Sequence, residues 1–335
     1  MTGIHRIFGV ELSPYSVKVR AYFRYKGIPH EWIVRNASTQ AEYQKHAKLP
    51  LIPVVVTPGG EALQDSTPIL ERMERAHPEP GIHPEDPALG FLSALVEEFG
   101  DEWGNKWMFH YRWARDVDRA SASQRIARTL MPGLERDGLA KAADAIRERM
   151  VGRVWFVGSS AQTAAQIEAS YLETLALLEA HLAQRPFLFG ARPAFGDFGL
   201  SCQLYECASD PTPGALLRER APGVSAWVER MQEPKAEGPF EPREALLPTL
   251  EPLLAGQVGR LFLPWSDANA RAIAQAREEF TVELDGRAWT QKPQKYHARS
   301  LEQLRRRYAG ISSASGLDPI LERTGCLRWL RAGAE

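Results

Sequence analysis

A serine near the start of the chain could do chemistry on a bound thiol. Ser13 follows an apolar run and precedes Pro14, so we expect it at or beside the first residue of a helix. Several backbone N–H groups lack partners there, and the positive end of the helix dipole favours an anion. A thiol has an ordinary pKa near ~8.5, so a hydroxyl donor and a dipole together would favour its reactive thiolate. Simple capping of the helix is the alternative role for Ser13.

Two further short motifs could hold the rest of a small anionic peptide. Ile52-Pro53 comes directly before the apolar residues 54–56, and a cis bond there would turn the backbone of Ile52 towards a ligand. Asp65 and Ser66 lie where a strand passes into a helix: the carboxylate could accept from an ammonium group, and the serine could bind a carboxylate. The alternatives are an ordinary proline at the start of a strand and, again, helix capping.

Alternating strand and helix patterns would position these motifs. The first 78 residues predict the order β-α-β-α-β-β-α, with strands at 4–10, 31–34, 54–57 and 61–63 and helices at 14–25, 39–47 and 67–77. Residues 78–87 form a proline-punctuated linker, after which helical periodicity dominates.

A third segment begins at about residue 234, where the composition changes to proline and glutamate. Residues 268–279 are predicted to be helical, and a β-hairpin is predicted around Asp285-Gly286. Ser300 with Gln303 has the capping-box spacing, which predicts that a helix starts at Ser300.

The order of the motifs and elements resembles that of the glutathione S-transferase superfamily. Residues 13–20, 51–55 and 63–66 resemble its thioredoxin-like domain, and the helical region after the linker is similar to its second domain. The resemblance implies an α/β thioredoxin-like domain at 1–78, an all-helical domain at 88–233, and a C-terminal extension at 234–335 packed on the helical domain.

The resemblance also implies roles for individual residues. Ser13 matches the catalytic serine that activates the glutathione thiol. The backbone of Ile52 would pair with the cysteinyl unit, with Pro53 as the cis-proline, and Asp65 and Ser66 would hold the γ-glutamyl group. The resemblance implies a homodimeric enzyme that joins glutathione to a small apolar electrophile.

Two positions depart from the family's pattern. Leu51 stands where a lysine commonly meets the glycyl carboxylate of glutathione, and Lys48, Lys45 or His46 could substitute; Lys48 is our candidate. Ala194 stands at the first position of a capping box that ends at Asp197, and the missing hydroxyl should cost on the order of 1 kcal/mol of stability.

Several other polar and aromatic residues have two possible interpretations. Tyr15 and Ser16 could supply a competing hydroxyl, although Tyr15 is better placed to pack or to line an acceptor pocket. Trp107 and Tyr111 could contact an apolar acceptor in the resembled fold, but aromatic stripes at helical spacing are more often core.

The composition narrows the remaining classes. A net charge of -1 gives no electrostatic basis for binding nucleic acid or an acidic membrane, and no apolar run approaches the ~20 residues of a membrane span. Three cysteines without a C-x-x-C pair, and scattered histidines, predict neither disulfides nor a bound metal. The composition favours a cytoplasmic protein, and the resemblance implies a glutathione transferase; the alternative is a non-catalytic glutathione-binding or scaffolding protein of the same fold.

Overall fold

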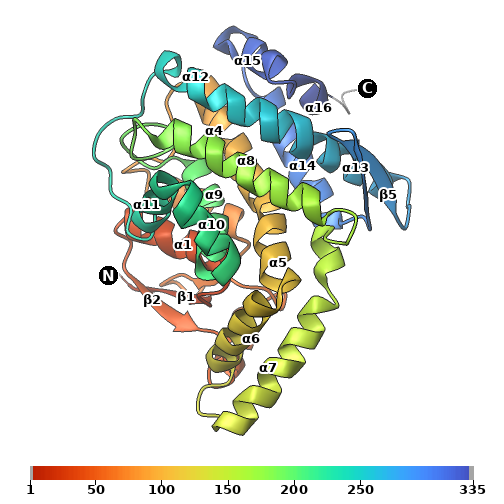
Figure 1. The fold of residues 1–335 in the computed structure, drawn as a ribbon. Helices are drawn as coiled ribbons and strands as arrows, with labels where there is room; N and C mark the ends of the chain where they lie inside the picture. The colour runs from red at the N-terminus through yellow and green to blue at the C-terminus, as the bar shows by residue number, and fades with distance from the viewer. Residues whose placement is uncertain (1–2, 332–335) are drawn as a thin grey trace.

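The computed structural model describes residues 3–331, so the outer ends of the predicted domain ranges, 1–2 and 332–335, lie outside it. The chain forms a thioredoxin-like unit, a helical unit and a C-terminal segment that packs on both (Figure 1). Among the described residues, no helix is long and apolar enough to cross a membrane.

The first unit has the predicted order of strands and helices. Its sheet runs β2-β1-β3-β4, with β1 parallel to β2 and antiparallel to β3, and with β4 antiparallel to β3. The elements are β1 (His5–Gly9), α1 (Pro14–Tyr25), β2 (His30–Val34), α2 (Gln40–His46), β3 (Val54–Val56), β4 (Ala62–Gln64) and α3 (Ser66–Ala76).

Strand register brings three chain segments to one edge of this sheet. Phe8 near the end of β1 pairs with Val54 at the start of β3, and Val54 pairs with Gln64 at the end of β4. Ser13, Pro53 and Asp65 each lie a few residues beyond this registered row. The local sequence supports the arrangement, since Pro14 occupies the first position of α1, where its missing N–H is no loss.

The second unit is helical, as predicted. Its helices are α4 (Pro87–Phe99), α5 (Asn105–Ala114), α6 (Asp116–Leu130), α7 (Arg136–Val151), α8 (Ala164–Leu182), α9 (Phe195–Ser209), α10 (Pro211–Arg220) and α11 (Pro222–Arg230). A π-helical stretch, Gly100–Gly104, joins α4 to α5. A Cβ on Gly100 would lie 2.7 Å from the backbone of Gly199, so this glycine permits close packing against α9.

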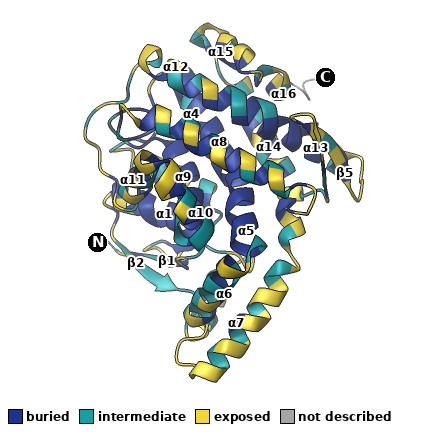
Figure 2. Ribbon diagram, viewed as in Figure 1, coloured by how far each residue is buried: buried dark blue, intermediate teal, exposed yellow. Residues whose placement is uncertain are grey.

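Helices α6 and α7 pack on each other and extend together from the body of the molecule (Figure 1). Figure 2 shows α7 mostly exposed, whereas α5 and α9 are largely buried. In α7 only Ala143 is buried.

The C-terminal segment folds onto the helical unit. It contains α12 (Arg243–Leu253), a π-helical stretch (Leu254–Phe262), α13 (Leu263–Ala274), β5 (Phe280–Leu284), β6 (Arg287–Gln291), α14 (Lys295–Ala309), α15 (Leu317–Arg323) and α16 (Leu327–Arg331). Phe262, Trp265 and Trp289 are fully buried and belong to the same core cluster as α4 and α5.

Two predictions in this segment need correction. The predicted helix at 268–279 begins earlier and ends at Ala274, and the helix predicted to start at Ser300 starts at Lys295. Ser300 therefore lies inside α14, where its hydroxyl donates to Glu98 of α4 instead of capping the helix. The predicted hairpin is present, with its turn at Asp285 and Gly286, both at positive φ.

Candidate functional site

Ser13 is the N-cap of α1. Its Oγ accepts a hydrogen bond from the backbone N–H of Ser16 at 3.4 Å, and the residue is partly exposed. Because the oxygen acts as the acceptor in this contact, the hydroxyl proton is free to point elsewhere. Both roles foreseen for Ser13, capping and donation to a ligand, are therefore compatible in one side chain.

The competing hydroxyls are engaged or buried. The Tyr15 hydroxyl donates to the backbone carbonyl of Asp101 at 3.1 Å and accepts from Asn105 Nδ2 at 3.4 Å. Burial also raises the pKa of Tyr15 well above its ordinary value. Ser16 is fully buried, and its Oγ has no hydrogen-bond partner among the described residues. Of these three hydroxyls, the geometry favours Ser13 as the one available to a ligand.

The Ile52-Pro53 bond is cis. The loop before it is held by Gln64, whose Oε1 accepts from the backbone N–H groups of Lys48 and Leu49 at 3.1 Å each. The Gln64 Nε2 donates to the carbonyls of Leu49 at 2.7 Å and Leu51 at 2.8 Å. The role of Gln64 was missed in the sequence, because nothing in the residue type or spacing marks a glutamine that supports a loop.

This loop carries Lys48, our candidate for binding the glycyl carboxylate, and Leu51, which replaces the family's lysine. Lys48 is exposed, and so is Leu51, with 60% of its surface accessible. His46, another candidate, is already in contact with Arg6 at 3.3 Å. The Lys48 side chain is thus free to reach a carboxylate beside the loop.

Asp65 and Ser66 occupy the start of α3. Asp65 has φ 79°, in the left-handed region that non-glycine residues rarely adopt, and its side chain does not cap the helix. Instead its two carboxylate oxygens each accept from the Tyr296 hydroxyl at 3.0 Å. Burial raises the pKa of Asp65, whereas the Tyr296 hydrogen bond and nearby Lys18 lower it. Ser66 is buried.

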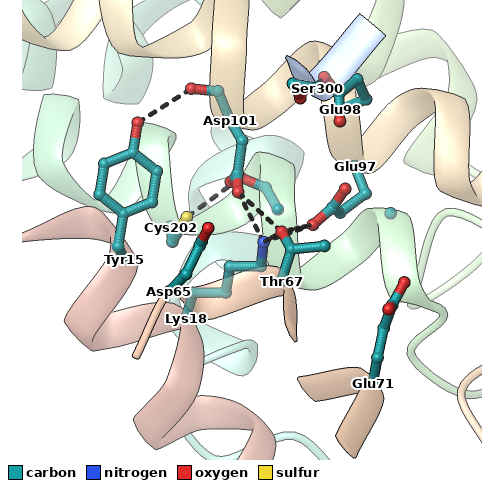
Figure 3. A network of polar contacts seen from close by, with 12 residues as sticks. Tyr15, Lys18, Asp65, Thr67, Glu71, Glu97, Glu98, Asp101, Cys202 and Ser300 are labelled. Carbon is teal, nitrogen blue, oxygen red and sulfur yellow. Dashed lines mark hydrogen bonds and ion pairs between the residues drawn. The ribbon is translucent and has the colours of Figure 1, made fainter. Parts of the chain in front are cut away.

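A buried ionic network lies behind these residues (Figure 3). The ammonium of Lys18 donates to Asp101 at 2.6 Å, to Thr67 Oγ1 at 3.0 Å and to Glu97. Burial would lower the pKa of Lys18, but Asp101 and Glu97 outweigh that effect and raise it above its ordinary value. The network ties α1 and α3 to α4 and the π-helical stretch that follows it.

The two predicted acceptor contacts on α5 lie in the core. Trp107 and Tyr111 are 0% and 1% exposed, and Trp107 Nε1 donates to Ser170 Oγ at 3.1 Å. Burial raises the pKa of Tyr111. Of the two interpretations of the aromatic stripe, this burial favours the core.

A cleft of about 330 Å³ lies beside the chain segment that leads into Ser13. The cleft is lined by Glu11, Leu12, Arg125, Arg128, Thr129, Tyr205 and Ser209. Its charged and aromatic lining has no signal in the local sequence, because α6 and α9 meet residue 12 only in the folded chain.

Two family models match the chain. Glutathione S-transferase, N-terminal domain, matches residues 7–81, and Glutathione S-transferase, C-terminal domain, matches residues 123–230. Together the two models match more than half of the chain, and both end before the C-terminal segment. No curated protein matches the chain.

Solved structures of two glutathione S-transferases and of a beta-etherase are similar to the chain. A glutathione S-transferase from Methylobacterium radiotolerans, in complex with glutathione sulfonate, is 22% identical, with 73% of this chain and 94% of that chain covered and a TM-score of 0.42. A glutathione S-transferase from Rhodospirillum rubrum is 18% identical, with 73% of this chain and 91% of that chain covered and a TM-score of 0.42. A beta-etherase from Sphingobium is 18% identical, with 75% of this chain and 99% of that chain covered and a TM-score of 0.45.

The first family model matches the thioredoxin-like unit and the second matches the helical unit. Residues 13, 53 and 65 at the edge of the sheet lie inside the first match. On these matches, the chain belongs to the glutathione S-transferase superfamily.

Proposed function

We propose that the protein is a glutathione transferase of the serine type. The observation that supports it best is the strand register, which brings Ser13, the cis Ile52-Pro53 bond and Asp65-Ser66 to one edge of one sheet. In this proposal the backbone of Ile52 pairs with the cysteinyl unit of glutathione, Asp65 and Ser66 hold its γ-glutamyl group, and Lys48 meets its glycyl carboxylate.

The chemical step follows from the position of Ser13. The thiol of glutathione loses its proton to solvent, and the Ser13 hydroxyl donates a hydrogen bond to the resulting thiolate at the positive end of α1. The sulfur then attacks the electrophilic carbon of the acceptor, forming a C–S bond, while the electron pair departs with the leaving group. Holding both reactants in contact supplies much of the remaining rate enhancement.

The resemblance implies an apolar electrophile as the acceptor. We assign the acceptor to the cleft beside Leu12, which is the one aliphatic residue of an otherwise polar, charged and aromatic lining. This cleft adjoins Ser13 along the chain, whereas Trp107 and Tyr111 are buried. Arg128 is exposed at the cleft, which favours acceptors that carry an anionic group. By analogy with the family, the protein works as a cytoplasmic homodimer.

Retention on glutathione resin, combined with turnover of a model electrophile, tests the proposal. Ser13→Ala should remain on the resin but lose most of its turnover, because it keeps the binding contacts and loses the donor to sulfur. Ser16→Ala is the matched control and should turn over like the wild type, since the Ser16 hydroxyl is buried. Wild-type turnover in Ser13→Ala would remove Ser13 from this role.

A non-catalytic glutathione-binding or scaffolding protein is the second candidate. Two observations favour it: Leu51 replaces the family's lysine, and Tyr296 already contacts the Asp65 carboxylate. Retention of the wild type on the resin without turnover of any electrophile would support this candidate.

A further inference from the structure

Tyr296 connects the C-terminal segment to the proposed glutathione site. It lies in the first turn of α14, and its hydroxyl is 3.0 Å from each carboxylate oxygen of Asp65. Tyr296 lies 231 positions after Asp65 in the sequence, so only the fold of the C-terminal segment can bring the two residues together. A tyrosine hydroxyl has an ordinary pKa near ~10, so it is protonated at neutral pH and acts as the donor to the carboxylate.

Contacts on both sides hold Tyr296 in this place. Just before it, the backbone N–H of Gln294 donates to Asn269 Oδ1 at 2.7 Å, and Asn269 Nδ2 donates back to the Gln294 carbonyl at 3.0 Å. Just after it, His297 pairs with Glu102 and stacks edge-on against Trp265. The start of α14 is therefore fixed by the helical unit and by α13.

The rest of α14 is fixed to the first two units as well. The Ser300 hydroxyl donates to Glu98, beside which it lies in Figure 3. Arg307 near the end of the helix pairs with Glu71 of α3. Because α14 is tied down along its length, the contact between Tyr296 and Asp65 is a built part of the site.

The two equal distances show which side of the Asp65 carboxylate the Tyr296 hydroxyl occupies. A donor placed 3.0 Å from both oxygens lies between them, on the face where an ammonium group would contact both oxygens at once. A ligand ammonium that takes this face must displace the tyrosine hydroxyl. The Tyr296 side chain is about half exposed, so it can move aside, but its hydrogen bond to a charged group is lost.

We propose that Tyr296 is a specificity-determining residue of this site: it reduces the preference of Asp65 for ligands that carry a free α-ammonium group. The inference rests on the proposed function, because it takes Asp65 as the group that meets the γ-glutamyl end of glutathione. The wild-type protein should therefore discriminate only weakly between glutathione and an analogue in which that ammonium is replaced by hydrogen.

The test compares two affinities in three proteins. Calorimetry gives the Kd of glutathione and of its des-amino analogue, glutaryl-cysteinyl-glycine, for the wild type, for Tyr296→Phe and for Tyr308→Phe. The control removes a hydroxyl from the same helix, one that donates to Asp318 at 2.8 Å. Tyr296→Phe should increase the preference for glutathione over the analogue about tenfold, through tighter glutathione binding. Tyr308→Phe should leave the preference unchanged.

The alternative outcomes separate this inference from the proposed function. An unchanged preference in Tyr296→Phe, with glutathione still bound, would overturn the inference alone. A reduced preference would also overturn it, since the hydroxyl would then assist the ammonium. Absence of glutathione binding in all three proteins would overturn the proposed function together with the inference.

Discussion

The ammonium of Lys18 lies 2.6 Å from Asp101 Oδ2, and this ion pair joins the thioredoxin-like unit to the helical unit. Lys18 is on the helix that Ser13 caps, and Asp101 is in the π-helical stretch whose backbone accepts from Tyr15. π-helical stretches are frequent at functional sites. Here the stretch presents both a carbonyl and a carboxylate to the first two turns of α1, and so positions the helix that carries Ser13.

Replacing Lys18 should destabilise the protein strongly. Lys18→Met leaves Asp101 and Glu97 buried without their cation, which typically costs about 3–5 kcal/mol of unfolding free energy. Urea unfolding measures the loss. The control is Arg306→Met, which breaks an exposed pair with Glu302 and should cost less than about 1 kcal/mol. Similar losses in the two variants would show that the buried network contributes no more than a surface pair.

Lys106 should make stability depend on pH. Its ammonium lies 3.5 Å from the centroid of the Trp265 ring, it is fully buried, and burial lowers its pKa from 10.5 to about 7. Between pH 7 and 10.5 the unfolded chain therefore binds more protons at this site than the folded chain. This contribution makes the folded state more stable as pH rises through that window, by up to about 1.4 kcal/mol per pH unit.

The variant Lys106→Met isolates this effect. The difference in unfolding free energy between the variant and the wild type should be largest near pH 7 and should shrink towards pH 10. Lys141→Met, on the exposed side of α7, is the control and should show no such trend. A difference that is independent of pH in Lys106→Met would contradict the assigned shift.

Gln64 should act as a positioning residue for the loop before Pro53. Gln64→Ala removes four hydrogen bonds to the backbone of residues 48–51 and leaves the Tyr43 hydroxyl as the remaining side-chain contact to the Leu49 and Leu51 carbonyls, so the loop is held less firmly beside the site. We expect the KM for glutathione to rise several-fold with a smaller change in kcat, since Ser13 is untouched. Gln44→Ala, an exposed residue of α2, is the control. A fall in kcat at constant KM would place Gln64 in the chemical step instead.

Ala194 marks a site where stability can be added. It is the N-cap of α9, and Asp197 already accepts from its backbone N–H at 2.9 Å, so half of a capping box is present. Ala194→Ser supplies the missing acceptor and should raise the unfolding free energy by about 1 kcal/mol. Ala194→Val changes the volume without adding an oxygen, and an equal gain in that variant would exclude capping as the cause.

The first 76 residues were predictable because their signals are local. Apolar runs, the Pro14 start of α1 and the turn residues between β3 and β4 each act within a few positions, and the predicted order of elements is the observed one. The capping-box prediction at Ser300 failed because a tertiary contact to Glu98 uses the hydroxyl inside a helix. Helix α12 was missed because Pro248 and Pro252 argue against a helix that packing on α8 nevertheless supports.

The residues of the candidate site also differ in whether local sequence could predict them. Ser13, Pro53 and Asp65 could be proposed because each follows or precedes a strand whose register is set by neighbouring residues. Tyr296 and the cleft at Leu12 could not, since they depend on contacts between distant segments. A tyrosine in an exposed helical turn carries no sequence signal for the carboxylate that it meets.

The most direct test of the account is an ultraviolet titration of the thiol of bound glutathione in the wild type and in Ser13→Ala. If the Ser13 hydroxyl donates to the thiolate, the bound thiol should have a pKa below its free value of ~8.5 in the wild type. In Ser13→Ala that pKa should rise by about one unit, which corresponds to about 1.4 kcal/mol. The same thiol pKa in both proteins would contradict the central claim.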